Sequence, residues 1–159
     1  MAAGPLMRTV DVVDVRAGAD AVYAAAAAVE RWPEFLPHYR WVRFLPNGGG
    51  QRLVEMAAWR PFGPLRWPTW WVSEMWTDPA RREVRYRHVR GITSGMEVCW
   101  KVTDHPAGAR AEIVHEWTGP RWPLIGAPAA AWVIGPVFVH GIASRTLAGI
   151  RKKVESSHG

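Results

Sequence analysis

Apolar and polar residues alternate along most of this chain, as they do in strands that turn one face to a core. Seven runs follow that pattern, and short segments rich in Gly, Pro and Asp separate most of them. The predicted strands cover residues 9–16, 39–45, 52–60, 65–77, 83–90, 95–103 and 109–118. Such short connections favour antiparallel hairpins over crossover helices, so we expect an antiparallel sheet.

Helices are predicted in two places. Asp20 can cap a helix over residues 21–31, whose alanines are strong helix formers, and Pro33 and Pro37 then force the chain out of helix. Pro136 fits the first turn of a final helix that runs toward Glu155, after a loop-like stretch over residues 119–135. The order is one strand, two short helices, six strands and one long helix. Without an internal repeat or linker, it predicts one domain over residues 1–159.

The same alternation sorts each strand into two faces. Glu97 and Lys101 mark the solvent face of one strand, and Glu112 and Glu116 mark that of the next. The opposite, inner face is mostly aromatic and aliphatic, as in small-molecule pockets. Its expected ligand-contacting side chains are Met56, Trp67, Trp71, Ser73, Met96, Trp100 and Trp117.

Four further inner-face side chains could carry chemistry: Arg60, Tyr86, His88 and His115. The two histidines and the tyrosine also have an ordinary explanation as core residues bonded to or packed on a neighbour. Arg60 is harder to explain as core, because a buried guanidinium must be paired or reach water. It lies at a strand end beside Pro61, so emergence into solvent stays open. His38, beside Pro37, is expected on the surface.

The composition adds 11 tryptophans in 159 residues, several times the usual share. Indole rings bring large apolar area, so the sheet has either a very large core or a lined cavity. The net charge is +6 and the pI is near 10.2, but the basic residues are spread along the chain without a nucleic-acid-binding motif. Solvated strand faces are the expected explanation, with an anionic membrane surface as the open alternative, and no nucleic-acid partner is expected.

The single cysteine, Cys99, excludes an internal disulfide and suits a reducing cytosol, so a cytoplasmic location is expected. No signal peptide is visible at the N-terminus. Residues 123–144 carry no Asp, Glu, Lys or Arg, which is close to a bilayer span in length. Three prolines and three glycines interrupt that stretch, so no transmembrane segment is expected.

Residues 21–37, an alanine-rich helix followed by Trp32-Pro-Glu-Phe-Leu-Pro37 between a first strand and a sheet, carry a resemblance. Together with Gly95-Met-Glu-Val98 and Arg145-Thr-Leu147, they resemble the polyketide cyclase/START-like superfamily, also called SRPBCC, Bet v 1-like or helix-grip. Within it, the chain looks similar to the polyketide cyclase/dehydrase and coenzyme Q-binding branch. The resemblance implies an α+β helix-grip fold, in which a seven-stranded antiparallel sheet curves around a long C-terminal helix.

The resemblance also implies an internal site for an apolar molecule. In polyketide aromatase/cyclases, an arginine with hydroxyl or imidazole side chains is thought to polarise carbonyls and steer aldol closure and dehydration. Arg60, Tyr86 and His88 could fill those roles here, with His88 or His115 moving protons near neutral pH.

Other members of the superfamily carry lipids or quinones, and some bacterial relatives act on ribosomes. Two main hypotheses therefore stand: a cyclase/aromatase, and a non-catalytic carrier or sensor of a quinone, isoprenoid or lipid. A third, less favoured hypothesis is a basic protein that docks on ribosomes or other macromolecules. Because the sequence shows no nucleophile triad, P-loop, dinucleotide motif or spaced metal ligands, no cofactor and no metal are expected. The oligomeric state stays open.

Overall fold

The computed structural model describes residues 7–46, 51–62, 64–91, 93–118 and 136–157, without the side chains of residues 60–62 and 136–138. The strands are β1 (Met7–Val15), β2 (Tyr39–Leu45), β3 (Arg52–Phe62), β4 (Leu65–Asp78), β5 (Glu83–Gly91), β6 (Glu97–His105) and β7 (Gly108–Trp117). The helices are α1 (Ala19–Ala27), the 3₁₀ turn η1 (Val29–Arg31), α2 (Trp32–Phe35) and α4 (Pro136–Ser156). The loop expected over residues 119–135 lies outside the described residues.

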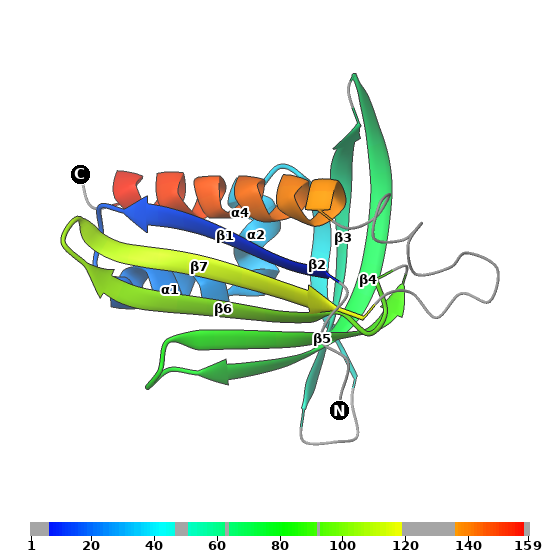
Figure 1. Ribbon diagram of the computed structural model, residues 1–159, viewed down its shortest axis with the longest axis horizontal. Coiled ribbons are helices and arrows are strands. Elements are labelled where there is room, and N and C mark those ends of the chain that lie inside the picture. The colour runs from blue at the N-terminus through cyan, green and yellow to red at the C-terminus, as the bar shows by residue number, and fades with distance from the viewer. Residues whose placement is uncertain (1–6, 47–50, 63, 92, 119–135, 158–159) are drawn as a thin grey trace.

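All seven strands form one antiparallel sheet in the order β1-β7-β6-β5-β4-β3-β2. Each neighbouring pair is joined by a hairpin, except that β7 pairs with β1. Figure 1 shows a strong curl, in which β2–β4 run steeply across the direction of β1, β6 and β7. The helix-grip fold predicted from the sequence is confirmed.

Two irregularities accompany this curl. The register of β2 against β3 shifts between Tyr39 and Trp41, and that of β4 against β5 shifts between Val72 and Ser73. A bulge leaves one residue unpaired, bends its strand and increases the local twist. The extra residues lie in β2 and β5. Each bulge therefore adds to the bending and twist of the sheet around the helix.

Helix α4 lies along the concave side of the sheet (Figure 1). Its buried side chains recur at helical spacing and form one apolar stripe: Val139, Ile142, Ala143, Leu147, Ile150 and Val154. Gly149 lets the helix approach α2 closely, because a Cβ added there would lie 2.1 Å from Cδ2 of the buried Leu36. The expected final helix is therefore confirmed, and it closes over the inner sheet face.

The helical segment after β1 differs from its prediction in detail. Helix α1 begins at Ala19 with Gly18 as its N-cap, and no side chain caps it. Asp20 instead accepts a hydrogen bond of 2.7 Å from Arg82, in the β4–β5 turn. Pro33 does not end a helix but occupies the first turn of α2, where a missing backbone N–H costs nothing.

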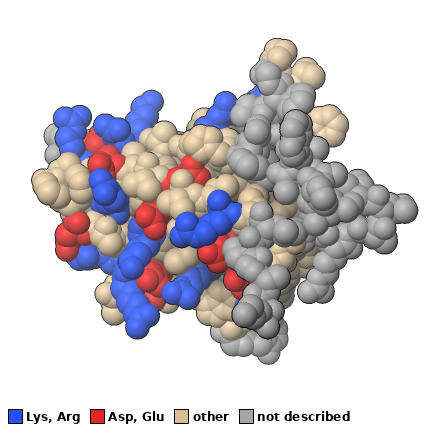
Figure 2. Space-filling view, viewed as in Figure 1, with Lys and Arg blue, Asp and Glu red and all other residues tan. Residues whose placement is uncertain are grey.

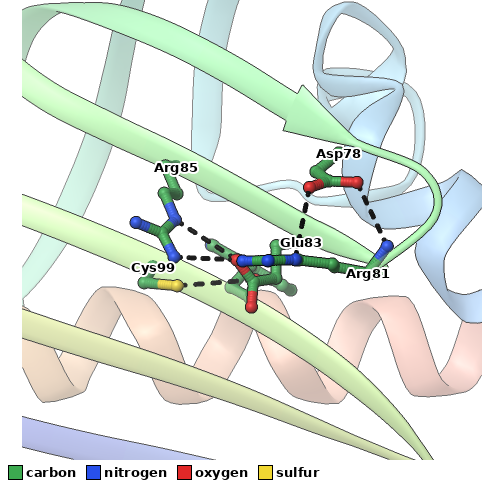
Figure 3. A network of polar contacts seen from close by, with 6 residues as sticks. Asp78, Arg81, Glu83, Arg85 and Cys99 are labelled. Atoms are coloured by element: carbon green, nitrogen blue, oxygen red, sulfur yellow. Dashed lines mark hydrogen bonds and ion pairs between the residues drawn. The ribbon is translucent and has the colours of Figure 1, made fainter.

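Charged side chains of both signs alternate over the outer face of the sheet, as Figure 2 shows. In Figure 3, the guanidinium of Arg85 points at Glu83, at 2.9 Å, while the backbone N–H of Arg81 donates to Asp78 at 3.1 Å. Glu83 is only 9% exposed, so its pairing with Arg85 offsets the cost of burying a carboxylate. Mixed ion pairs on strand faces account for much of the arginine content.

Gly108 is a position where the fold requires glycine. Its φ is +135°, and a Cβ would lie 2.6 Å and 2.7 Å from the carbonyl oxygens of Ala17 and Val15. We expect Gly108→Ala to lower the free energy of unfolding by about 1–3 kcal/mol, the usual cost of such backbone strain, measured by urea denaturation. Gly141→Ala is the control, because nothing lies within 4 Å of that Cβ and alanine favours helix by about 1 kcal/mol. Equal effects at both sites would contradict this assignment.

Candidate functional site

A cavity of about 60 Å³ lies between the concave face of the sheet and the N-terminal half of α4. The strands contribute Tyr39, Met56, Trp71, Tyr86, His88, Val98, Trp100, Ile113 and His115 to its wall. The helices and the β5–β6 connection add Trp32, Thr93, Met96, Val139, Ile142, Ala143 and Thr146. Ligand pockets for drug-sized molecules are usually about 300–1,000 Å³, so a large ligand would have to widen this cavity.

Packed aromatic rings form one side of the wall. Trp32 meets Tyr39 edge-on at 5.2 Å between centroids and lies 5.6 Å from Trp100. Tyr39 in turn packs edge-on against Trp71 at 6.3 Å. Such contacts hold the rings in defined orientations and contribute more than their buried area alone. The wall is therefore apolar and shaped by rings.

His88 is fixed at the other end of this ring system. Its imidazole stacks on Trp71 at 5.8 Å with a 7° interplanar angle, and its Nδ1 lies 2.6 Å from Oγ1 of Thr93. Burial, with a smaller effect from nearby His115, lowers the pKa of His88 to about 3. At neutral pH the ring is uncharged, and its orientation is set by the stack and the hydrogen bond.

Tyr86 and His115 present polar atoms that have no partner among the described residues. The Tyr86 hydroxyl and Nδ1 of His115 are inaccessible to water and make no hydrogen bond in that part of the chain. Burial raises the pKa of Tyr86 well above its usual value and lowers the pKa of His115 to about 3. A buried unpaired polar group costs free energy, and such groups in native proteins mark functional positions or bound water.

The side of the cavity formed by α4 carries a second polar cluster. Thr146 Oγ1 donates to the carbonyl of Ile142 at 2.8 Å, so the hydroxyl is free to accept from Nε2 of His38 at 2.9 Å. His38 is 7% exposed, and burial lowers its pKa to about 4. The expectation that His38 lies on the surface was therefore wrong, because the Pro37 break turns the chain under α4 instead of outward.

Seven of the eleven predicted site residues line the cavity: Met56, Trp71, Tyr86, His88, Met96, Trp100 and His115. Ser73 and Trp117 are buried outside the described lining, and Nε1 of Trp117 donates to the Ser94 carbonyl at 3.1 Å. Trp67 is 65% exposed, because the end of the β3–β4 hairpin projects past the inner face. Arg60 pairs with Trp67 in the backbone, but its side chain lies outside the described residues.

Sequence reasoning missed Trp32, Tyr39, Thr93 and Thr146 as wall residues. In the sequence, alternation with Val42 and Phe44 pointing inward would turn Tyr39 to the outer face. The bulge between Tyr39 and Trp41 reverses that phase, so Tyr39 faces the cavity. Thr93 lies in a turn, where no periodicity applies. The Trp-Pro break after the alanine helix was the signal for Trp32, since it directs the indole under the sheet.

The described part of the chain holds no group of three or more His, Cys, Asp or Glu side chains that could bind a metal ion. None of its helices combines the length and the apolar character needed to cross a bilayer.

A family model described as polyketide cyclase / dehydrase and lipid transport matches residues 15–134. The chain belongs to this family, and its fold is that of the aromatase/cyclase and START superfamily. A comparison with proteins of curated function gave no match.

Three solved structures illustrate the likeness. Zhui aromatase/cyclase from Streptomyces sp. R1128 is 21% identical, with 96% of this chain and 95% of that chain covered and a TM-score of 0.75. The di-domain ARO/CYC StfQ from the steffimycin biosynthetic pathway is 17% identical, with 96% and 52% covered and a TM-score of 0.72. A START superfamily protein from Mycobacterium smegmatis is 15% identical, with 94% and 95% covered and a TM-score of 0.62. At these identities, the likeness establishes the fold.

The buried imidazoles predict an acid-sensitive fold. The pKa of His115 is about 3 in the folded protein against an ordinary 6.5, so the unfolded chain binds the proton first. Stability is full above about pH 6.5 and falls with acidification toward pH 3, by up to about 1.4 kcal/mol per pH unit for each such histidine. Urea denaturation between pH 8 and 4 should show a shallower fall for His115→Gln than for the parent. Parallel curves below pH 6.5 would mean that His115 titrates normally.

Proposed function

We propose that the cavity binds an oxygen-bearing aromatic or polyketide-like molecule, oriented by the neutral polar groups of its wall. The observation that carries the proposal is the pair of unpartnered atoms, Tyr86 Oη and His115 Nδ1, set in a wall of aromatic rings. Apolar walls supply burial, and a few polar groups select orientation. A carbonyl or hydroxyl oxygen of the ligand would pair with either atom, and neither has a partner among the described protein residues.

Cyclisation of a poly-β-ketone is the reaction that these groups suit. An imidazole, His88 or His115, would accept a proton from a carbon between two carbonyls, leaving an enolate. The enolate carbon would then bond to the carbon of a third, more distant carbonyl, and the oxygen of that carbonyl would take up the proton from the imidazolium. Loss of the resulting hydroxyl with a hydrogen from the neighbouring carbon, as water, leads toward the aromatic ring. Tyr86 would donate to the oxygen that becomes negative.

The low pKa of the histidines bears on this role. Each imidazole is uncharged at neutral pH and so can accept a proton, but its imidazolium form is disfavoured by burial. An adjacent enolate would offset that cost by charge attraction. Proton transfer would then depend on the substrate being in place, which suits a site that must not react without it.

Arg60 would stabilise the enolate if its guanidinium reaches the cavity from β3. Arg60→Ala should then weaken binding of an oxygenated aromatic by about 1.5–3 kcal/mol, the range for hydrogen bonds to charged groups. Arg60→Lys should recover part of the affinity, because it restores charge without the forked geometry. Calorimetric titration of the three proteins is the measurement, and parental affinity in Arg60→Ala would place the side chain in solvent.

A carrier of a quinone, isoprenoid or lipid is the second candidate. It is favoured by the absence of any charged side chain among the described residues that line the cavity. A carrier needs burial and orientation but no group that stabilises charge. Native mass spectrometry of the purified protein would show whether an apolar molecule co-purifies, and turnover of a poly-β-ketone thioester would separate the two functions.

Binding itself is tested with two probes that differ by one oxygen, 1-naphthol and naphthalene. Trp100→Ala should weaken both, because it removes a wall ring, whereas Trp76→Ala on the outer face should weaken neither. Tyr86→Phe should weaken only naphthol, about 5- to 10-fold, the size of one neutral hydrogen bond. Fluorescence titration measures all four proteins. Equal losses at Trp100 and Trp76, or equal losses of both probes in Tyr86→Phe, would contradict the proposal.

A further inference from the structure

The β3–β4 hairpin extends beyond the other strands and beyond α4 (Figure 1). Near its end, Leu65 and Trp67 are 66% and 65% exposed, the two highest values among the large hydrophobic residues described. At the top of Figure 2, tan atoms, which belong to neither Lys and Arg nor Asp and Glu, stand out beside atoms that are not described. Single exposed apolar residues are ordinary, but a leucine and a tryptophan together at a projecting tip form a contact surface.

Three arginines gather around Trp59 and the groove that it lines. The guanidinium carbons of Arg40 and Arg66 are 4.7 Å and 5.2 Å from the centroid of the Trp59 ring. Arg66 and Arg145 line a surface groove of about 420 Å³, together with Trp59, Leu36 and other residues of the α2 end and α4. Tip and groove thus combine apolar side chains with a cluster of positive charge.

These arginines differ from most others in the described chain. Within that part, Arg40, Arg66 and Arg145 form no ion pair with a carboxylate. Most of the other described arginines do so, as in Arg8–Glu116, Arg87–Glu97 and Arg110–Asp14, with Arg52 and Arg90 as exceptions. Three unneutralised guanidinium groups beside one another favour an anionic partner.

The groove and the cavity share a wall. His38 lines the groove, and its Nε2 bonds to Oγ1 of Thr146, which lines the cavity. Arg145 precedes Thr146 on α4, so the two residues face the two spaces from adjacent positions. A partner seated on the groove would therefore lie one side chain away from the ligand site.

We propose that this surface docks on an anionic phospholipid bilayer. Leu65 and Trp67 enter the headgroup boundary, while Arg40, Arg66 and Arg145 bind lipid phosphates. An indole with one polar end suits that boundary, and arginine suits phosphate. A nucleic acid would stack its bases on aromatic rings and would make no use of an aliphatic side chain. The exposed Leu65 beside the indole therefore favours a membrane. A bilayer would also dissolve an apolar cavity ligand, but the docking does not depend on the ligand's identity.

The test is co-sedimentation with vesicles of phosphatidylcholine alone and of phosphatidylcholine with 30% phosphatidylglycerol. The parent should bind the anionic vesicles, less tightly at high salt, and the neutral vesicles at least 10-fold more weakly. Leu65→Ser with Trp67→Ser should reduce binding to anionic vesicles at least 10-fold. Arg66→Gln with Arg145→Gln should remove the preference for anionic lipid.

Matched controls are Val12→Ser, an exposed apolar change on β1, and Arg8→Gln, an exposed arginine paired with Glu116. Both should bind as the parent does, and naphthol titration should show that the tip variants keep the cavity. The proposal is overturned if the parent protein does not co-sediment with anionic vesicles, or if the tip variants bind these vesicles as tightly as the parent does. It is also overturned if the tip residues instead mediate self-association in sedimentation velocity, or if an oligonucleotide competes the vesicles away.

Discussion

The fold depends on burial of the apolar stripe of α4, which packs against the concave face of the curled sheet. Val139, Ile142, Leu147 and Ile150 are buried in this contact, and most of the other features follow from it. The sheet has to bend around a cylinder, so β2 and β5 carry bulges. Gly149 leaves room for the side chain of Leu36, the residue that follows α2. The buried helix face and the two bulges thus go with one curved sheet.

Where the sheet and the first turns of α4 diverge, the aromatic rings do not fill the space, and polar atoms remain on its wall. On the outer face, a carboxylate such as that of Glu83 forms an ion pair with an arginine, Arg85. Inside, Tyr86 and His115 have no partner among the described residues. Low polarity strengthens any hydrogen bond formed there and penalises any that is missing, so these atoms are the basis of the proposed binding site. Family membership defines the class of protein, and these atoms define its candidate chemistry.

Much of the fold could be predicted from the chain because it depends on local periodicity. Alternation identified all seven strands, and Tyr39–Leu45 matches to the residue. Turn residues implied antiparallel hairpins, and Pro136 marked the start of α4. Face assignment also placed Tyr86, His88, Trp100 and His115 on the inner side, because alternation is unbroken through β6 and β7 and through β5 as far as His88, where the bulge begins.

The remaining features depend on contacts between segments far apart in sequence. A bulge adds one residue and reverses the phase, so Tyr39 faces the cavity although alternation turned it outward. Alternation places Trp67 on the inner face, but its hairpin projects beyond the rest of the sheet, so the side chain is exposed. Alternation predicts the face of a side chain and not its distance from the core. His38 is buried because α4, more than 100 residues later, supplies Thr146. The amino-acid sequence by itself determined the elements and their faces, since these follow from backbone geometry within a few residues. Only the tertiary structure decided which inward side chains meet in a cavity, because that depends on where the sheet curls and where it ends.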